Sequence, residues 1–415
     1  MKFFSRSRKS EHWAISLDIG TEFVKTLIFH IEGERAVVKG AGKARQRLSD
    51  MAGGAVTDIE GVIRNADLAI AQAVKEANIL PREVIMGIAG ELVKGATTRI
   101  RYIRPNPKSK ITVAELEDLI RRVQRRAFDQ ARAQLAWESG HEEIDVKLVN
   151  AAVTDVKIDS PSITNPIGFQ GREVHIGVFN AFAPIVHFGA LQTIAEELEL
   201  DLMAIAAEPY AVAKAVSEGE GTSYSAIFMD IGGGTTDIAL VVNGGVVGTK
   251  MFAFGGRSFT RRIAATLGLP FSQAEEIKLA YARGELSDER TKIVADAVRA
   301  DCEVWFAGVE LTLGEFQNID LLPPRILLCG GGSSLPDLVA ILEDGHWSKK
   351  LPFSKTPSVS HIEPKGVYSV VDETKTLVSV QDVTPMALAN LAIGLVGEGN
   401  VVDTLVGRAM TTLRK

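Results

Sequence analysis

The sequence predicts an α/β protein with two similar halves that face each other across a cleft. Two stretches, 15–29 and 228–241, share one layout: an apolar run, an Asp-Ile-Gly turn that carries threonine, and a second apolar run. Strand patterns and helical periods follow each of them, in the order of an α/β unit. Because one chain makes the same turn twice, far apart, we expect a duplicated fold.

The composition is that of an ordinary globular protein of several domains. The 415 residues are 46% hydrophobic and 24% charged, with a net charge of −6, so no nucleic-acid partner is expected. Cys302 and Cys329 stand among apolar residues and are expected to be reduced core thiols. No run reaches the roughly 18 apolar residues of a membrane span, and the basic N-terminus lacks the apolar part of a signal peptide. A cytoplasmic chain is therefore expected.

The first α/β stretch covers residues 11–89. Val24–His30 and Arg35–Gly40 continue the strand pattern that begins at Ile15, which predicts a three-stranded meander. Residues 58–78 have a helical apolar period with Asp58 as the N-cap, and the apolar "EVIMGIAG" predicts a buried strand.

Residues 90–180 differ in character and predict an inserted β-α-β subdomain. An alternating stretch, "ATTRIRYIR", precedes a long amphipathic helix that opens with Thr112 and Glu115 in capping-box spacing. Two more strand patterns flank "SITNPIGFQG", which is rich in turn-forming residues.

The α/β pattern resumes at residue 181. A helix over Pro184–Glu199, a strand over Leu202–Ala206 and a helix starting near Glu208 are predicted first. The repeated strand–turn–strand layout comes next. The remaining predictions are a helical stretch (258–318), a strand, glycine loop and helix (324–342), an irregular and partly stranded segment (345–384), a helix of small residues (385–396) and a short terminal helix (398–415).

The two repeated turns carry groups that suit a nucleoside triphosphate. Glycine lets the backbone approach a ligand closely, and successive turn amides form an anion-binding concavity. Magnesium keeps most of its waters and needs only one or two carboxylates, which Asp18 and Asp230 would supply. An ordinary hairpin is the alternative for each turn, although three consecutive glycines cost conformational entropy without structural gain. The candidate cofactor-binding residues of the two turns are Gly20, Thr21, Glu22, Gly232, Gly233, Gly234 and Thr235, all of which except Glu22 are candidates for phosphate contact.

Three further elements complete the candidate site. A glycine loop between a strand and a helix, Gly330, Gly331, Gly332 and Ser333, can lie against an adenosine. Glu275 and Lys278 share a helix face and either bind ribose hydroxyls or form an intrahelical ion pair. Glu208 begins a helix, where its carboxylate either orients an attacking water or interacts with the helix dipole.

In this order, the elements resemble the actin-like ATPase superfamily, whose fold is a duplicated ribonuclease H-like α/β domain. The inserted segment and its Asn165-Pro166-Ile167-Gly168 turn are similar to the extra subdomain of FtsA, the bacterial cell-division actin homologue, and so is the run "GGRSFTRRIAATLGLPFSQAEEIK". The matching superfamily segments are 15–29, 204–216, 227–243, 326–342 and 386–397.

The resemblance implies a domain plan and residue roles. Subdomain 1A would comprise 11–89, 181–217 and 386–397, with subdomain 1C at 90–180. Subdomain 2A would comprise 222–257 and 306–385, with a reduced subdomain 2B at 258–305. ATP and Mg²⁺ are the implied cofactors. Glu208 and Asp230 are the implied catalytic residues, and Asp18 and Asp230 would hold the metal's hydration shell.

The function implied by FtsA is an ATP-binding, polymerising scaffold that links the division ring to the inner membrane, with slow ATP hydrolysis. Its expected partners are further copies of the chain and division proteins, FtsZ among them. A short subdomain 2B instead favours PilM, the related scaffold of type IV pilus assembly, and a sugar or acetate kinase is a third class for which we find no substrate-binding insertion. Residues 398–415 either form an amphipathic membrane helix or dock on their own domain; the apolar face has Val402, Leu405, Val406, Ala409, Met410 and Leu413.

Overall fold

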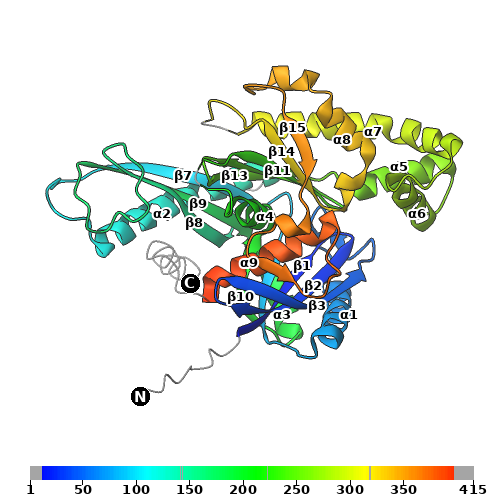
Figure 1. The fold of residues 1–415 in the computed structure, drawn as a ribbon, viewed down its shortest axis with the longest axis horizontal. Helices are drawn as coiled ribbons and strands as arrows, with labels where there is room; N and C mark the ends of the chain where they lie inside the picture. The colour runs from blue at the N-terminus through cyan, green and yellow to red at the C-terminus, as the bar shows by residue number, and fades with distance from the viewer. Residues whose placement is uncertain (1–11, 141, 143, 222, 317–318, 397–415) are drawn as a thin grey trace, which may run out of the picture.

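The computed structural model describes residues 12–140, 142, 144–221, 223–316 and 319–396. Within these residues, a six-stranded sheet and an eight-stranded sheet form the body of the molecule, and a short hairpin of β4 (Met51–Ala52) and β5 (Ala55–Val56) stands apart from them. In Figure 1 the six-stranded sheet lies below the larger one, and the chain crosses between them more than once.

The six-stranded sheet belongs to the first half. Its central meander is antiparallel, and β6 and β10 continue it in parallel on the side of β1. The strands, in spatial order, are β10 (Asp201–Ala207), β6 (Glu83–Ile88), β1 (His12–Ile19), β2 (Phe23–Glu32), β3 (Arg35–Arg45) and β16 (Val370–Asp372). Helix α1 (Ile59–Ala77) packs on β3, and α9 (Val383–Val396) packs on β1.

The second half repeats this topology, which confirms the predicted duplication. Its meander is β11 (Ala226–Ile231), β12 (Thr236–Val242) and β13 (Gly245–Phe252). β14 (Arg325–Cys329) lies parallel to β11, just as β6 lies parallel to β1, and β15 (Ser358–His361) follows it. The order β14-β11-β12-β13 therefore matches β6-β1-β2-β3, because similar strand–turn–strand sequences build both meanders.

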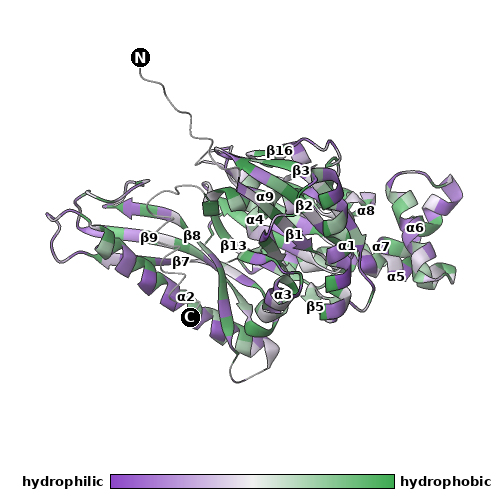
Figure 2. Cartoon of the chain, turned by 90° about the horizontal axis from the view of Figure 1, so that it is seen from below, coloured by the Kyte–Doolittle hydropathy of each residue, from purple (hydrophilic) through white to green (hydrophobic). Residues whose placement is uncertain are grey.

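The inserted segment folds as three antiparallel strands with one long helix on a face of the sheet. These elements are β7 (Lys94–Ile103), α2 (Val113–Ser139), β8 (Val146–Ile158) and β9 (Glu173–Pro184). As predicted, Thr112 caps α2 by accepting a hydrogen bond from the Glu115 N–H. The apolar side of α2 is buried on the sheet, and Figure 2 shows mostly hydrophilic residues along its outer side. β7 also pairs with β13, so the inserted strands extend the sheet of the second half.

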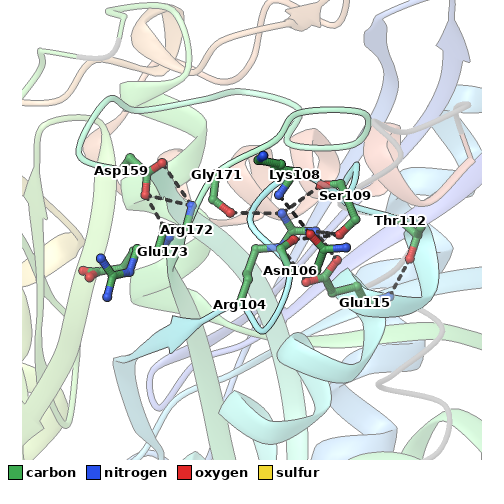
Figure 3. Close-up of polar contacts among 10 residues, drawn as sticks. All are labelled: Arg104, Asn106, Lys108, Ser109, Thr112, Glu115, Asp159, Gly171, Arg172 and Glu173. Atoms are coloured by element: carbon green, nitrogen blue, oxygen red, sulfur yellow. Dashed lines mark hydrogen bonds and ion pairs between the residues drawn. The ribbon is translucent and has the colours of Figure 1, made fainter.

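A buried arginine organises the loops at the far end of this subdomain (Figure 3). The Arg104 side chain is 3% exposed, and its Nη1 donates to the carbonyls of Ser109 and Gly171. Its Nε donates to Glu115 at 2.7 Å. One guanidinium thus joins the loop after β7, the loop before β9 and the first turn of α2. The predicted Asn-Pro-Ile-Gly turn lies in the loop before β9, where Asn165 Oδ1 accepts from the Ile167 N–H.

The helical stretch expected over 258–318 consists of three helices: α5 (Gly256–Leu267), α6 (Phe271–Ala282) and α7 (Asp288–Gly314). The other α-helices of the described residues are α3 (Ile185–Glu197), α4 (Glu208–Ser217) and α8 (Pro336–Glu343). The segment 345–384 is irregular, as expected, but its strand β16 lies in the sheet of the first half beside β3. The subdomain boundaries given above stay a prediction. No helix among the described residues has the length and apolar character needed to span a bilayer.

Candidate functional site

The two repeated turns lie against each other at the junction of the two halves. In the first turn, the Gly20 N–H donates to the Phe23 carbonyl at 3.0 Å; in the second, the Gly232 N–H donates to the Thr235 carbonyl at 2.9 Å. A Cβ atom on Gly234 would lie 2.8 Å from Thr21 Oγ1. A side chain at position 234 would therefore force Thr21 to move, so glycine suits the place where the turns meet.

Each turn follows an aspartate near the end of its first strand: Asp18 is buried and Asp230 is half-buried, and the strand register determines which residue lies opposite each of them. Asp18 faces Lys25, whose Nζ donates to Asp18 Oδ2 at 2.8 Å. Asp230 faces Asp237 in the matching position of the second half. Burial lowers the pKa of Lys25, but the charges of Asp18, Asp230 and Glu208 outweigh burial and leave that pKa raised. Asp18 and Asp230 therefore share one cluster rather than separate surfaces.

Two acids of this cluster carry oxygens that have no hydrogen-bond partner within the described part of the chain. They are Glu208 Oε1 and Asp237 Oδ1. Burial, followed by the charges of Asp18, Asp237 and Asp230, raises the pKa of Glu208 well above its usual range. Burial and Asp230 raise the pKa of Asp237 to about 8, although Thr235 Oγ1 donates to Asp237 Oδ2 at 2.9 Å. The cluster holds more carboxylates than its lysine can balance, so a bound cation would stabilise it.

The third glycine loop lies directly beside Asp230. Gly330 has a φ of +79°, and a Cβ atom there would lie 2.0 Å from Asp230 Oδ1, so only glycine fits this position. Gly331 lies against Gln381, and Ser333 is buried with its Oγ donating to the Gly330 carbonyl at 2.7 Å. Gly332 lies against Ile231 at the end of β11. Asp230 also accepts a hydrogen bond from Thr384 Oγ1 at 2.7 Å, from the first turn of α9. The loop is thus part of the same site as the second turn.

Glu275 and Lys278 lie on α6 and bind each other. Their Nζ–Oε2 distance is 2.8 Å, and both residues are buried. Lys278 Nζ also donates to the Gly256 carbonyl at 3.1 Å, while the Gly256 N–H donates to the carbonyl of Gly232 in the second turn. The ion pair weighed in the sequence analysis is therefore present, and it adjoins the site through α5.

Three further residues of this site were missed by the sequence analysis. Lys25 and Asp237 could have been found from the strand register, because each follows its aspartate by the same number of residues. Arg257 is the third, and its Nε donates across the junction to Glu22 Oε2 at 2.8 Å. A pair 235 positions apart leaves no local signal in a single sequence.

Comparisons with known proteins agree with this architecture. The family model "FtsA: Cell division protein FtsA" matches residues 227–373. The cell division protein FtsA of Neisseria meningitidis serogroup B is 27% identical over 356 residues, covering 79% of this chain and 80% of the relative. FtsA of Pseudomonas aeruginosa is 26% identical over 361 residues, covering 81% and 82%.

The chain is FtsA-like and has the actin-like fold.

A solved structure of a PilM–PilN type IV pilus biogenesis complex matches the fold with a TM-score of 0.59. It is 19% identical, and the match covers 92% of the FtsA-like chain and 97% of the solved one. At that identity the likeness concerns the fold alone.

Proposed function

We propose that this FtsA-like chain is an ATP-binding, polymerising scaffold of bacterial cell division that links the division ring to the inner membrane. The observation that carries the proposal is the contact between two glycine turns, one from each half, beside Asp18, Lys25, Asp230 and Glu208. The sequence relatives reported above are cell division proteins, which gives the nucleotide site its biological setting.

The phosphates of ATP would lie along the backbone amides of the two turns, 20–22 and 232–235. Successive turn amides attract anions, and Lys25 adds a partly buried positive charge. The loop 330–333 would lie against the adenosine. Glu275 and Lys278 would contact the ribose, since their ion pair adjoins the second turn through Gly256.

The acidic cluster suits a magnesium ion that keeps its water shell. Within the described residues, no group of three acidic, histidine or cysteine side chains is arranged to hold a metal directly. Magnesium in nucleotide sites needs only one or two carboxylates besides phosphates and waters. Asp18 and Asp230 would hold that shell, and the ion would neutralise charge on the phosphates. The unpartnered oxygens of Glu208 and Asp237 support a cation in this place.

Glu208 would position the attacking water for slow hydrolysis. Its carboxyl lies at the first residue of α4, is 9% exposed and has one oxygen without a partner among the described residues. Burial and the charges of Asp18, Asp237 and Asp230 raise the pKa of Glu208, and a bound cation would counter those charges and favour the carboxylate. Asp230 would complete the catalytic pair by orienting the reacting groups.

Assembly would follow from ATP held between the halves, because a bound nucleotide fixes the angle between them. Copies of the chain, FtsZ and other division proteins are the proposed partners. The proposed location is the cytoplasmic face of the inner membrane, through the terminal segment 398–415. That segment lies outside the described residues.

Electron microscopy of the protein on an anionic lipid monolayer tests polymerisation and attachment together. We expect filaments with ATP and magnesium, and none on the lipid when residues 398–415 are deleted. Flotation with anionic vesicles provides the quantitative counterpart. ATP binding without filament formation and without vesicle binding would refute the scaffold proposal. The proposed nucleotide site would still stand.

A PilM-like cytoplasmic scaffold of type IV pilus assembly is the second candidate. It is favoured by the fold match, which covers 97% of the PilM-type chain, and by the small helical region formed by α5, α6 and the start of α7. Binding to an N-terminal peptide of a PilN-type protein, measured by fluorescence anisotropy and unaffected by vesicles, would favour this candidate over the division scaffold.

A further inference from the structure

Arg257 carries a buried hydrogen-bond donor that the fold leaves unused. The residue lies in the first turn of α5 and is 4% exposed. Its Nε donates to Glu22 Oε2, but its Nη2 is buried and has no hydrogen-bond partner within the described residues. An unpaired buried polar group destabilises the fold, and more so when it is charged. A native protein usually keeps such a group for a ligand, an ion or a water.

The surroundings of Arg257 favour an anion as that ligand. Glu22 accepts hydrogen bonds from two guanidinium groups: Arg257 on one oxygen and the Arg45 Nε, at 2.7 Å, on the other. One carboxylate thus faces two cations, so a positive charge remains. α5 has no side-chain cap at its N-terminus, where the helix dipole adds positive potential.

The position of this charge relates it to the two turns. The Arg257 N–H donates to the Gly233 carbonyl at 2.7 Å. A Cβ atom on Gly233 would lie 3.0 Å from the Cβ of Glu22. The guanidinium therefore lies at the contact between the first turn and the second, and its Nε is bonded to Glu22 of the other half.

We propose that Arg257 is a phosphate-binding residue that donates from Nη2 to the phosphate chain of the bound nucleotide, and that Glu22 is its positioning residue. The inference rests on the proposed nucleotide site and adds to it a contact between Arg257 and a phosphate that the sequence did not predict. Glu22 would then act through Arg257, fixing the guanidinium across the junction of the halves, rather than touching the phosphates itself. Since one arginine holds both halves and the ligand, it also slows release of the nucleotide.

The test compares full-length variants R257A, R257K and E22A with R262K as a matched control. Arg262 lies on the same helix but pairs with Asp301 and is half exposed. Affinities for fluorescent ADP and for adenosine are measured by anisotropy, and release rates by chase with unlabelled ADP. We expect R257A and R257K to bind ADP at least tenfold more weakly, mainly through faster release. Lysine provides a single point charge and cannot replace the two-armed contact.

Binding of adenosine, which has no phosphates, should stay within twofold in R257A and R257K. E22A should weaken ADP binding less than R257A does, and E22Q, which keeps an acceptor, should restore much of the loss. R262K should match the parent protein. Thermal melting by circular dichroism identifies any variant that fails to fold, and R257K then takes the place of R257A.

Three outcomes would overturn the inference. ADP binding within threefold of the parent in both Arg257 variants would show that the guanidinium does not contact phosphate. Equal losses for ADP and adenosine would show a purely structural role. A parent protein that binds neither labelled ADP nor ATP would refute the nucleotide site itself, and this inference with it. The first two outcomes leave the proposed function standing.

Discussion

Lys25 and Asp237 occupy equivalent positions in the two halves: each faces the aspartate that ends the first strand of its meander. The duplicated frame therefore places a cation in one half where the other half has an acid. A symmetric pair of Asp–Lys hairpins would be neutral, whereas this arrangement sets Asp237 opposite Asp230, and burial together with the neighbouring acids raises the pKa values of Asp230 and Glu208. The difference between the halves makes the site suitable for a hydrated cation beside phosphates.

Removing the Lys25 ammonium should destabilise the fold strongly. K25A would leave Asp18, whose side chain is 3% exposed, without its cation. Loss of one partner of a buried ion pair costs about 3–5 kcal/mol, because the remaining charge is neither paired nor hydrated. Urea unfolding followed by fluorescence measures the change. K39A removes the exposed Lys39–Glu373 pair and should cost no more than about 1 kcal/mol. Equal costs for the two variants would contradict the buried pair.

Stability should fall as pH rises through the neutral range, partly because of Asp237. The pKa of Asp237 is raised to about 8 from an ordinary 3.8 by burial and by Asp230. Between these values the folded chain binds a proton that the unfolded chain has lost, so unfolding becomes easier as pH rises. The slope is at most about 1.4 kcal/mol per pH unit.

The variant D237N removes that titration and should therefore lose less stability than the parent between pH 5 and pH 8. Urea unfolding at several pH values gives the comparison. D129N, at an exposed position on α2, is the control and should follow the parent. Parallel curves for D237N and the parent would mean that Asp237 does not carry the proton.

Substitution of Gly330 should damage both the fold and nucleotide binding. In G330A the new Cβ would lie 2.0 Å from Asp230 Oδ1, at a φ of +79°, so Asp230 or the loop has to move. We expect a loss of more than about 2 kcal/mol in stability, together with weaker ADP binding. The control G284A has a similar φ of +68° but open space around it. Backbone strain alone should cost G284A about 1 kcal/mol with ADP binding unchanged.

Replacement of the Glu208 carboxylate by an amide should separate binding from hydrolysis. E208Q keeps the shape of the side chain and removes a buried acid whose pKa is raised, so stability should not fall. The affinity of E208Q for ATP should stay within a few-fold of the parent's. Its rate of phosphate release should drop at least tenfold, as expected when a water-positioning group is lost. A coupled phosphate assay under single-turnover conditions gives the rate. An unchanged hydrolysis rate in E208Q would mean that a residue other than Glu208 positions the attacking water.

The sequence predicted the elements well where local chemistry decides them. The Asp58 cap of α1 and the Thr112 cap of α2 are both present, because each depends on a side chain and an amide a few residues away. The duplication was also predictable, since the turn motif itself repeats. The position of β16 was not, because three residues next to a strand of the other half have no distinctive pattern.

The site was predicted only in part for the same reason. The glycine turns and their aspartates could be predicted because their sequence motif is distinctive. Lys25 and Asp237 look like ordinary strand residues until the register is known, and the Glu22–Arg257 pair depends on the way the halves meet. The raised pKa values of Glu208 and Asp237 come from burial among other acids, which the linear order does not reveal.

The pairing of β7 with β13 has a mechanical consequence. The inserted subdomain is joined covalently to the first half at both of its ends, yet its strands hydrogen-bond to the sheet of the second half at Gly95–Thr249 and Ala96–Gly248. A rotation between the two halves would then either break the hydrogen bonds between β7 and β13 or move the whole inserted subdomain together with the second half. Because Arg104 joins its outer loops, the subdomain would move as one body, and a small rotation between the halves would produce a larger displacement at its far end.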